Sequence, residues 1–134
     1  MEHVYPKHGL KGSQHERVFS LLLRLQKRCC AICGENVSRL PKGLYGRTNL
    51  HYALYVDHCH TTGMIRGLLC GDCNGMLGLL EDSRRLQSHP DAVPGFESWH
   101  AAYLPAILTY MRVDRWFPRK DTALHIQRLL EQLD

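Results

Sequence analysis

The feature that most constrains this chain is a pair of short cysteine motifs. Two residues separate Cys30 from Cys33, and two separate Cys70 from Cys73. A two-residue spacer in a tight turn lets both sulfurs of a pair bind one tetrahedral ion, and four thiolates form a closed structural zinc site. Buried free cysteines are common core residues, but packing alone does not account for two such pairs. The sequence therefore predicts a four-cysteine zinc site.

The remaining cysteines, Cys29 and Cys59, leave one alternative open. Cys29 could replace Cys30 as a ligand, at a three-residue spacing from Cys33, whereas Cys59 lies between two histidines and is expected to point away from them. The first twelve residues contain no apolar segment typical of a secretory signal. We therefore expect a cytoplasmic protein whose thiols stay reduced and do not form disulfides.

The rest of the chain predicts a single α+β domain, because its 134 residues suffice for one core and not for two. No stretch reaches the roughly 18 apolar residues that a membrane-spanning helix needs, so no membrane partner is expected. Apolar spacing and turn formers predict helices over about 14–28, from 71, over about 104–113 and after Asp121, with strands at 51–56 and 64–69. We divide the domain into an N-terminal helix (14–28), a zinc-stabilised core (29–82) and a helical C-terminal extension (83–134).

A second group of reactive residues lies in and just after the expected hairpin. Asp57, His58 and His60 are almost consecutive, and Asn74 directly follows Cys73. Carboxylate and amide oxygens suit Mg²⁺ or Mn²⁺, and a neutral imidazole can take a proton from water near neutral pH. In a regular strand Asp57 and His58 would point to opposite faces, so joint action on one phosphate requires a bend between them. The sequence therefore predicts a metal-dependent phosphodiesterase site.

Positive charge is concentrated in the first third of the chain. Residues 1–47 hold nine lysines and arginines against three acidic residues, whereas the rest of the chain is slightly acidic. A basic segment of this kind suits a partner that carries phosphates. The loop expected over 34–49 contains three of these basic residues, and we take them as candidate DNA contacts: Arg39, Lys42 and Arg47.

The longest ordered motif resembles a known nuclease family. It runs from Val56 to Asn74 as VDHCHTTGMIRGLLCGDCN, is followed by Leu77 and Gly78, and is preceded by the first cysteine pair. In these residues the chain resembles the recombination endonuclease VII family, which belongs to the HNH, or ββα-metal, nucleases. The resemblance covers about residues 29–82. It implies a small treble-clef-like core in which a hairpin and a helix hold one catalytic ion, with structural zinc underneath.

The resemblance also implies a role for each motif residue. His58 would be the general base, and Asp57 and Asn74 would hold the catalytic Mg²⁺ or Mn²⁺. His60 would contact a phosphate or orient the site, and Arg66 would reach a DNA phosphate. Because Asn74 directly follows a zinc cysteine, a zinc that fixes the cysteine would also fix the helix start that carries the asparagine.

The resemblance thus implies an enzyme that hydrolyses phosphodiester bonds in duplex, nicked or branched DNA. It also implies that a phage or mobile element encodes the protein and that the protein acts in a bacterial host cell. Family members that resolve branched DNA act as dimers, so a homodimer is a further expectation. Two features depart from the pattern: no second histidine follows Asn74, and residues 83–134 match no part of the motif. A non-catalytic zinc finger that binds DNA or protein, and a nuclease that cuts RNA, remain alternatives.

Overall fold

The computed structural model describes residues 10, 12–40 and 53–133. Helices are combined with one two-stranded antiparallel sheet, as the α+β prediction requires. Among the described residues, no helix is both long enough and apolar enough to cross a membrane. In chain order the elements are α1 (Gly12–Leu25), η1 (Val37–Arg39), β1 (Leu54–His58), β2 (Ile65–Cys70), α2 (Gly71–Glu81), α3 (Arg84–Ser88), η3 (Pro90–Ala92), α4 (Val93–Tyr110), η4 (Val113–Arg115) and α5 (Thr122–Leu133).

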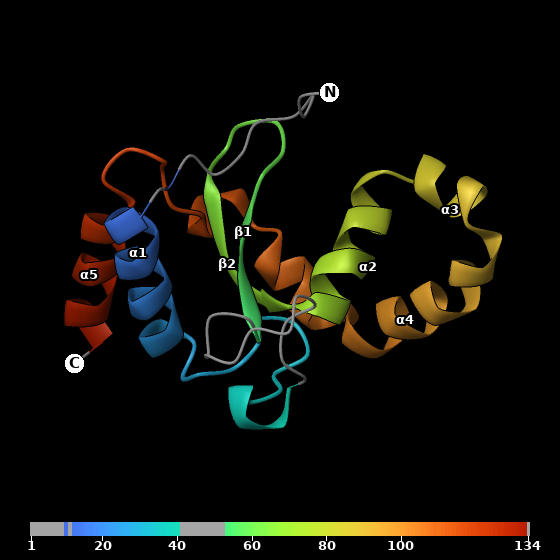
Figure 1. The fold of residues 1–134 in the computed structure, drawn as a ribbon, viewed down its shortest axis with the longest axis horizontal. Helices are drawn as coiled ribbons and strands as arrows, with labels where there is room; N and C mark the ends of the chain where they lie inside the picture. The colour runs from blue at the N-terminus through green and yellow to red at the C-terminus, as the bar shows by residue number, and fades with distance from the viewer. Residues whose placement is uncertain (1–9, 11, 41–52, 134) are drawn as a thin grey trace.

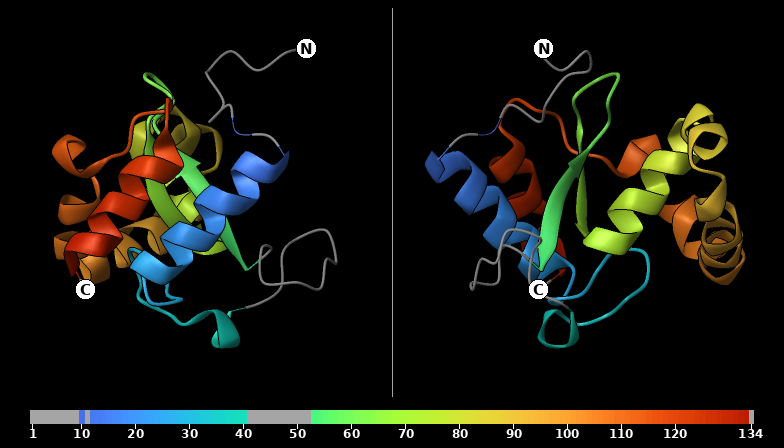
Figure 2. Two further views of the ribbon diagram at one scale, coloured as in Figure 1. Left: turned by 90° about the vertical axis from the view of Figure 1, so that its left-hand side faces the viewer. Right: turned by 45° about the vertical axis from the view of Figure 1, so that its right-hand side comes forward.

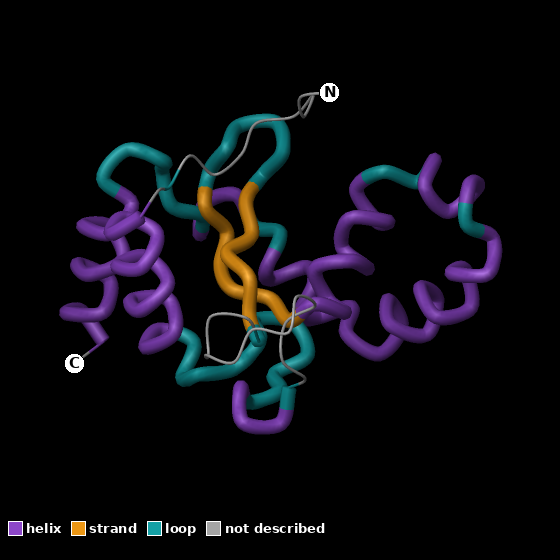
Figure 3. Tube along the Cα trace, in the orientation of Figure 1, coloured by secondary structure: helices purple, strands orange, loops and turns teal. Residues whose placement is uncertain are grey.

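A twisted hairpin of β1 and β2 lies in the middle of the molecule, between two groups of helices (Figures 1 and 3). α1 and α5 lie side by side on one flank (Figure 2), where Arg17 donates a 2.7 Å hydrogen bond to Gln127. α2, α3 and α4 form an arch on the other flank. The apolar core joins these layers, and its fully buried side chains include Phe19, Leu22, Leu54, Ile65, Leu68, Leu69, Leu77 and Ile126.

The pairing of β1 with β2 contains a break in register. Asp57 lies opposite Gly67 and His58 lies opposite Ile65, so Arg66 is an extra residue on β2. This irregularity is a β-bulge, which bends a strand and re-aims the side chains beside it. The extra residue lies on β2, and the break in register falls between Asp57 and His58, where the sequence predicts a bend.

Two other segments cover the outer edge of β2. The Gln26 side chain accepts a 2.8 Å hydrogen bond from the Leu68 N–H and donates one of 3.0 Å to the Leu68 carbonyl, much as a neighbouring strand would. Further along, the backbones of Phe117 and Ile65 exchange hydrogen bonds of 2.8 and 2.9 Å. A two-stranded hairpin is only marginally stable by itself. These contacts tie it to the end of α1 and to the C-terminal segment.

Two helix predictions need correction. The first helix ends at Leu25 and not at residue 28, because Lys27 and Arg28 adopt positive φ angles of 54° and 63°. The helix predicted over about 104–113 begins earlier, because α4 starts at Val93 and has Pro94 in its first turn, where proline is tolerated. The predicted start would have placed Pro105 in the first turn of the helix. In the structure, Pro105 follows a kink at Tyr103 inside the longer helix α4.

Candidate active site and metal centre

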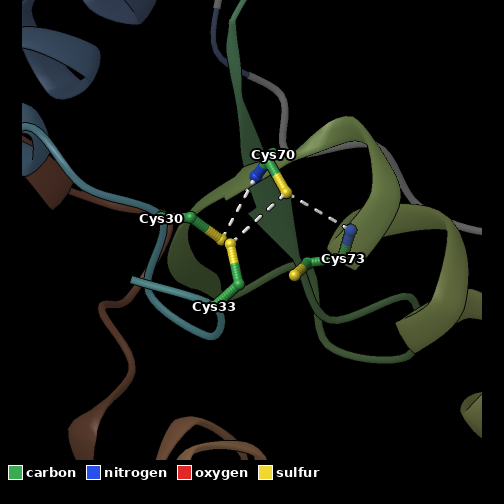
Figure 4. A group of neighbouring side chains, drawn as sticks. All are labelled: Cys30, Cys33, Cys70 and Cys73. Atoms are coloured by element: carbon green, nitrogen blue, oxygen red, sulfur yellow. Dashed lines mark hydrogen bonds between the residues drawn. The ribbon is translucent and has the colours of Figure 1, made fainter. Parts of the chain in front are cut away.

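Four cysteine sulfurs gather where the segment after α1 meets the start of α2 (Figure 4). They belong to Cys30, Cys33, Cys70 and Cys73, and they all lie within 4.8 Å of one another. The sulfurs of Cys33 and Cys70 are 3.9 Å apart, close to the roughly 3.8 Å expected between tetrahedral ligands of one zinc ion. The cluster fits a structural zinc and includes Cys30, so the alternative ligand Cys29 is wrong. None of the six cysteines is joined to another by a disulfide in the structure.

The four neighbouring thiols shift one another's pKa values. The pKa of Cys30 lies far below its ordinary value because Cys70 and Cys73 hydrogen-bond to its sulfur. The hydrogen bond with Cys30, together with burial, raises the pKa of Cys70 to about 12, and burial raises the pKa of Cys33. A cation would allow all four sulfurs to become thiolate ligands.

Trp99 of α4 supports the same cluster. Its buried indole Nε1 donates a 3.4 Å hydrogen bond to the Cys73 sulfur. Donors of this kind orient a ligating sulfur and disperse its charge. The sequence did not predict this contact, because no local pattern relates Trp99 to a cysteine 26 positions earlier in the chain.

Replacing Trp99 with phenylalanine is expected to weaken zinc binding about tenfold, since the change removes the donor and keeps most of the apolar ring. Zinc affinity would be measured by competition with a chromophoric chelator. Trp116→Phe is the matched control, because the Trp116 indole donates to the Tyr110 carbonyl and not to a cysteine. Equal zinc affinities of Trp99→Phe and wild type would contradict this role.

The two candidate histidines lie together where β1 leads into the hairpin turn. The ring centroids of His58 and His60 are 5.0 Å apart, and both side chains are partly exposed. Cys59 between them is buried, and its sulfur accepts a 3.5 Å hydrogen bond from the Thr62 N–H within the turn. The bulge thus leaves two imidazoles accessible beside a buried thiol that lies outside the zinc cluster.

Asp57 is buried at 5% exposure and is held by two other side chains. Its Oδ2 accepts hydrogen bonds from Arg66 Nε at 2.8 Å and from the Tyr110 hydroxyl at 2.7 Å, and its Oδ1 accepts one from Arg66 Nη2 at 3.2 Å. Burial, and then the charge of Asp57, raise the pKa of Tyr110 well above its ordinary value. Tyr110 therefore remains a protonated donor to the carboxylate.

Arg66 does not lie where a DNA contact was expected. Its guanidinium pairs with Asp57 and also with Glu81, through Nη1 and Nη2 at 2.8 and 2.9 Å, and it lies 5.3 Å from the centre of the Trp116 ring. Burial lowers the pKa of Arg66, but the hydrogen bonds with Glu81 and Asp57 outweigh that effect, so the group stays charged. With its side chain 1% exposed, Arg66 cannot reach a phosphate in this conformation.

The other expected site residues lie on separate elements. Asn74 is exposed in the first turn of α2, directly after the zinc cysteine Cys73. Among the described residues, Asn74 makes no hydrogen bond with Asp57. Binding of one ion by both residues is therefore a proposal. Arg39 is 79% exposed at the end of η1, 3.7 Å from Glu35. Lys42 and Arg47 lie outside the described residues.

The sequence model of one protein family, described as recombination endonuclease VII, matches residues 7–90. The chain belongs to the recombination endonuclease VII family. Neither a curated protein nor a solved structure matches the chain significantly. The family is one of endonucleases. The match to it spans the zinc cysteines, the histidine hairpin and α2, and it extends beyond residues 29–82 at both ends.

All of α4 and all of α5 lie beyond the matched part of this endonuclease VII family member. Trp99 and Tyr110 nevertheless come from that region and reach the two candidate centres. A third such residue is the exposed Arg119, whose side chain lies over Gly63, where an added Cβ would come within 2.6 Å of its Cδ. A basic group is thereby placed on the histidine hairpin, and only the pairing of Phe117 with β2 brings it there.

Proposed function

We propose that this endonuclease VII family member is a metal-dependent DNA endonuclease that hydrolyses phosphodiester bonds by a one-metal HNH mechanism. The main support is the break in register between Asp57 and His58, because the buried carboxylate and the partly exposed imidazole both lie beside it at the end of β1. The zinc cluster adds support, since it would fix the helix start that carries Asn74. Arg39 and Arg119 are exposed, and Arg119 lies over Gly63 of the hairpin turn, so we propose both as contacts to DNA phosphates.

The residues would divide the chemistry as follows. His58 would take a proton from the water that attacks the phosphorus atom, and His60, beside it, would contact the phosphate or orient the site. Asp57 Oδ1 and the Asn74 amide oxygen would hold one Mg²⁺ or Mn²⁺, because both are hard oxygen donors and Oδ1 keeps unused lone-pair capacity. When bound, this ion stabilises negative charge on the phosphate and on the departing 3′ oxygen.

Cleavage of a supercoiled plasmid and of a synthetic four-way junction, each with Mg²⁺ and with EDTA, tests the proposal. We expect metal-dependent cutting of DNA, and cutting that favours the junction would identify branched DNA as the substrate and predict a dimer in solution. Plasmid nicking without that preference would indicate a duplex nuclease. Cutting confined to an RNA substrate would contradict the choice of DNA. Binding of DNA without cutting would replace the enzyme with a zinc-stabilised binding module.

A further inference from the structure

The C-terminal part of α4 contacts the candidate metal-binding carboxylate. Tyr110 is the last residue of α4 and lies well beyond the family match, yet its hydroxyl hydrogen-bonds to Asp57 Oδ2 at 2.7 Å. Both partners are buried, Tyr110 at 8% and Asp57 at 5% exposure. A buried hydroxyl–carboxylate bond that joins two distant segments sets the carboxylate's orientation, because neither group can turn toward water.

The two oxygens of Asp57 differ in how they are used. Oδ2 receives the short bonds from Tyr110 and from Arg66 Nε, whereas Oδ1 receives one longer bond of 3.2 Å from Arg66 Nη2. A carboxylate has about four lone-pair sites. The protein therefore occupies Oδ2 with two donors and leaves Oδ1 as the oxygen with capacity for an additional ligand.

Glu81 determines the charge that such a ligand would meet. Arg66 alone would neutralise Asp57, and a cation gains little from a neutral ion pair. Glu81 contacts Arg66 through both of its carboxylate oxygens, at 2.8 and 2.9 Å, so the three side chains together carry one net negative charge. The Glu81 side chain is 25% exposed and belongs to α2, the helix that also carries Asn74.

We propose that Tyr110, Arg66 and Glu81 are positioning residues that fix Asp57 Oδ2 on the protein, direct Oδ1 to the catalytic divalent ion and keep the cluster negative. This inference rests on the proposed function, since it assumes that Asp57 is a metal ligand. It also gives the C-terminal extension a role: α4 completes a site whose other residues lie within the family match.

Mn²⁺ binding to the zinc-loaded full chain, followed by the EPR signal of free Mn²⁺, tests the inference without DNA or turnover. Tyr110→Phe removes one donor and keeps the ring, and Glu81→Gln removes one charge from a partly exposed side chain. Each is expected to weaken Mn²⁺ binding about tenfold, as is usual when an outer partner of a metal ligand is lost. Tyr103→Phe on the same helix is the matched control, with unchanged binding expected.

Substitution of Asp57 separates failure of this inference from failure of the proposed function. Asn would keep an amide oxygen that can itself bind the ion, so the decisive variant is Asp57→Ala, and Asp57→Asn tests only the loss of charge. If Mn²⁺ binding survives in Asp57→Ala, Asp57 is not the ligand, and both the metal assignment and the positioning role are overturned. If Asp57→Ala keeps the fold and loses binding while Tyr110→Phe and Glu81→Gln bind like wild type, only the positioning role is overturned. A lower melting temperature of Tyr110→Phe with unchanged Mn²⁺ affinity would likewise overturn it, because the hydroxyl would then serve stability alone.

Discussion

Replacing Cys70 with serine is expected to abolish stoichiometric zinc binding and to unfold the core. Cys70 ends β2 and caps α2, so the loss of its sulfur releases the junction between the hairpin and the helix as well as one ligand. Structural zinc sites supply folding free energy of about 10–16 kcal/mol in small domains, which exceeds the total stability of most domains. Zinc content by mass spectrometry and thermal unfolding by circular dichroism would measure both effects.

Cys29→Ser is the matched control for this change. The Cys29 sulfur lies outside the cluster and donates to the Lys27 carbonyl at 3.3 Å, a contact that a serine hydroxyl can also make. We expect one zinc per chain and a change in unfolding free energy within about 1 kcal/mol. A folded Cys70→Ser protein with one zinc, or a folded wild type without zinc, would show that the cluster is not a structural metal site.

Replacing His58 with alanine is expected to slow DNA cleavage about 10²- to 10⁴-fold, which is the usual contribution of a general base. The side chain is half-exposed beside the bulge, so its loss leaves no large cavity and the fold should survive. Initial rates of plasmid or junction cleavage at saturating Mg²⁺ would measure the loss. Unchanged zinc content and an unchanged melting temperature would confirm that chemistry alone was affected.

His125→Ala provides the comparison, because His125 is an exposed histidine on α5, the helix that lies beside α1. Its cleavage rate should equal that of wild type. If His58→Ala cleaves as fast as His125→Ala, then His58 is not the base. The proton transfer would in that case need another group, and His60, whose ring lies 5.0 Å away, would be the next candidate.

Local sequence patterns predicted the parts of the fold that local geometry controls. The cysteine spacing identified Cys30, Cys33, Cys70 and Cys73, because two residues in a tight turn place both sulfurs on one centre whatever surrounds them. The hairpin followed from two short apolar runs with turn residues between them, and the start of α2 from the helical pattern after Gly71. The two-residue period of a strand predicted a bend after Asp57, and the break in register with β2 falls at that point. The sequence did not predict the full length of α4, because Pro94 and Gly95 are typical of a loop. The helix forms there because Phe96 and Trp99 pack on the core, which only the structure shows.

The sequence by itself thus determined the four cysteines of the candidate zinc site, the hairpin and the family to which they belong. Only the tertiary structure decided what the charged residues do, since the partners of a buried charge come from segments far apart in the chain. Arg66 resembles a surface arginine in sequence, yet the bulge turns it inward between Asp57 and Glu81. In sequence, Tyr110 is an aromatic residue of a helix with no special pattern around it. The packing of α4 brings its hydroxyl into a hydrogen bond with Asp57. A buried carboxylate requires such partners, and folding alone selects which residues supply them.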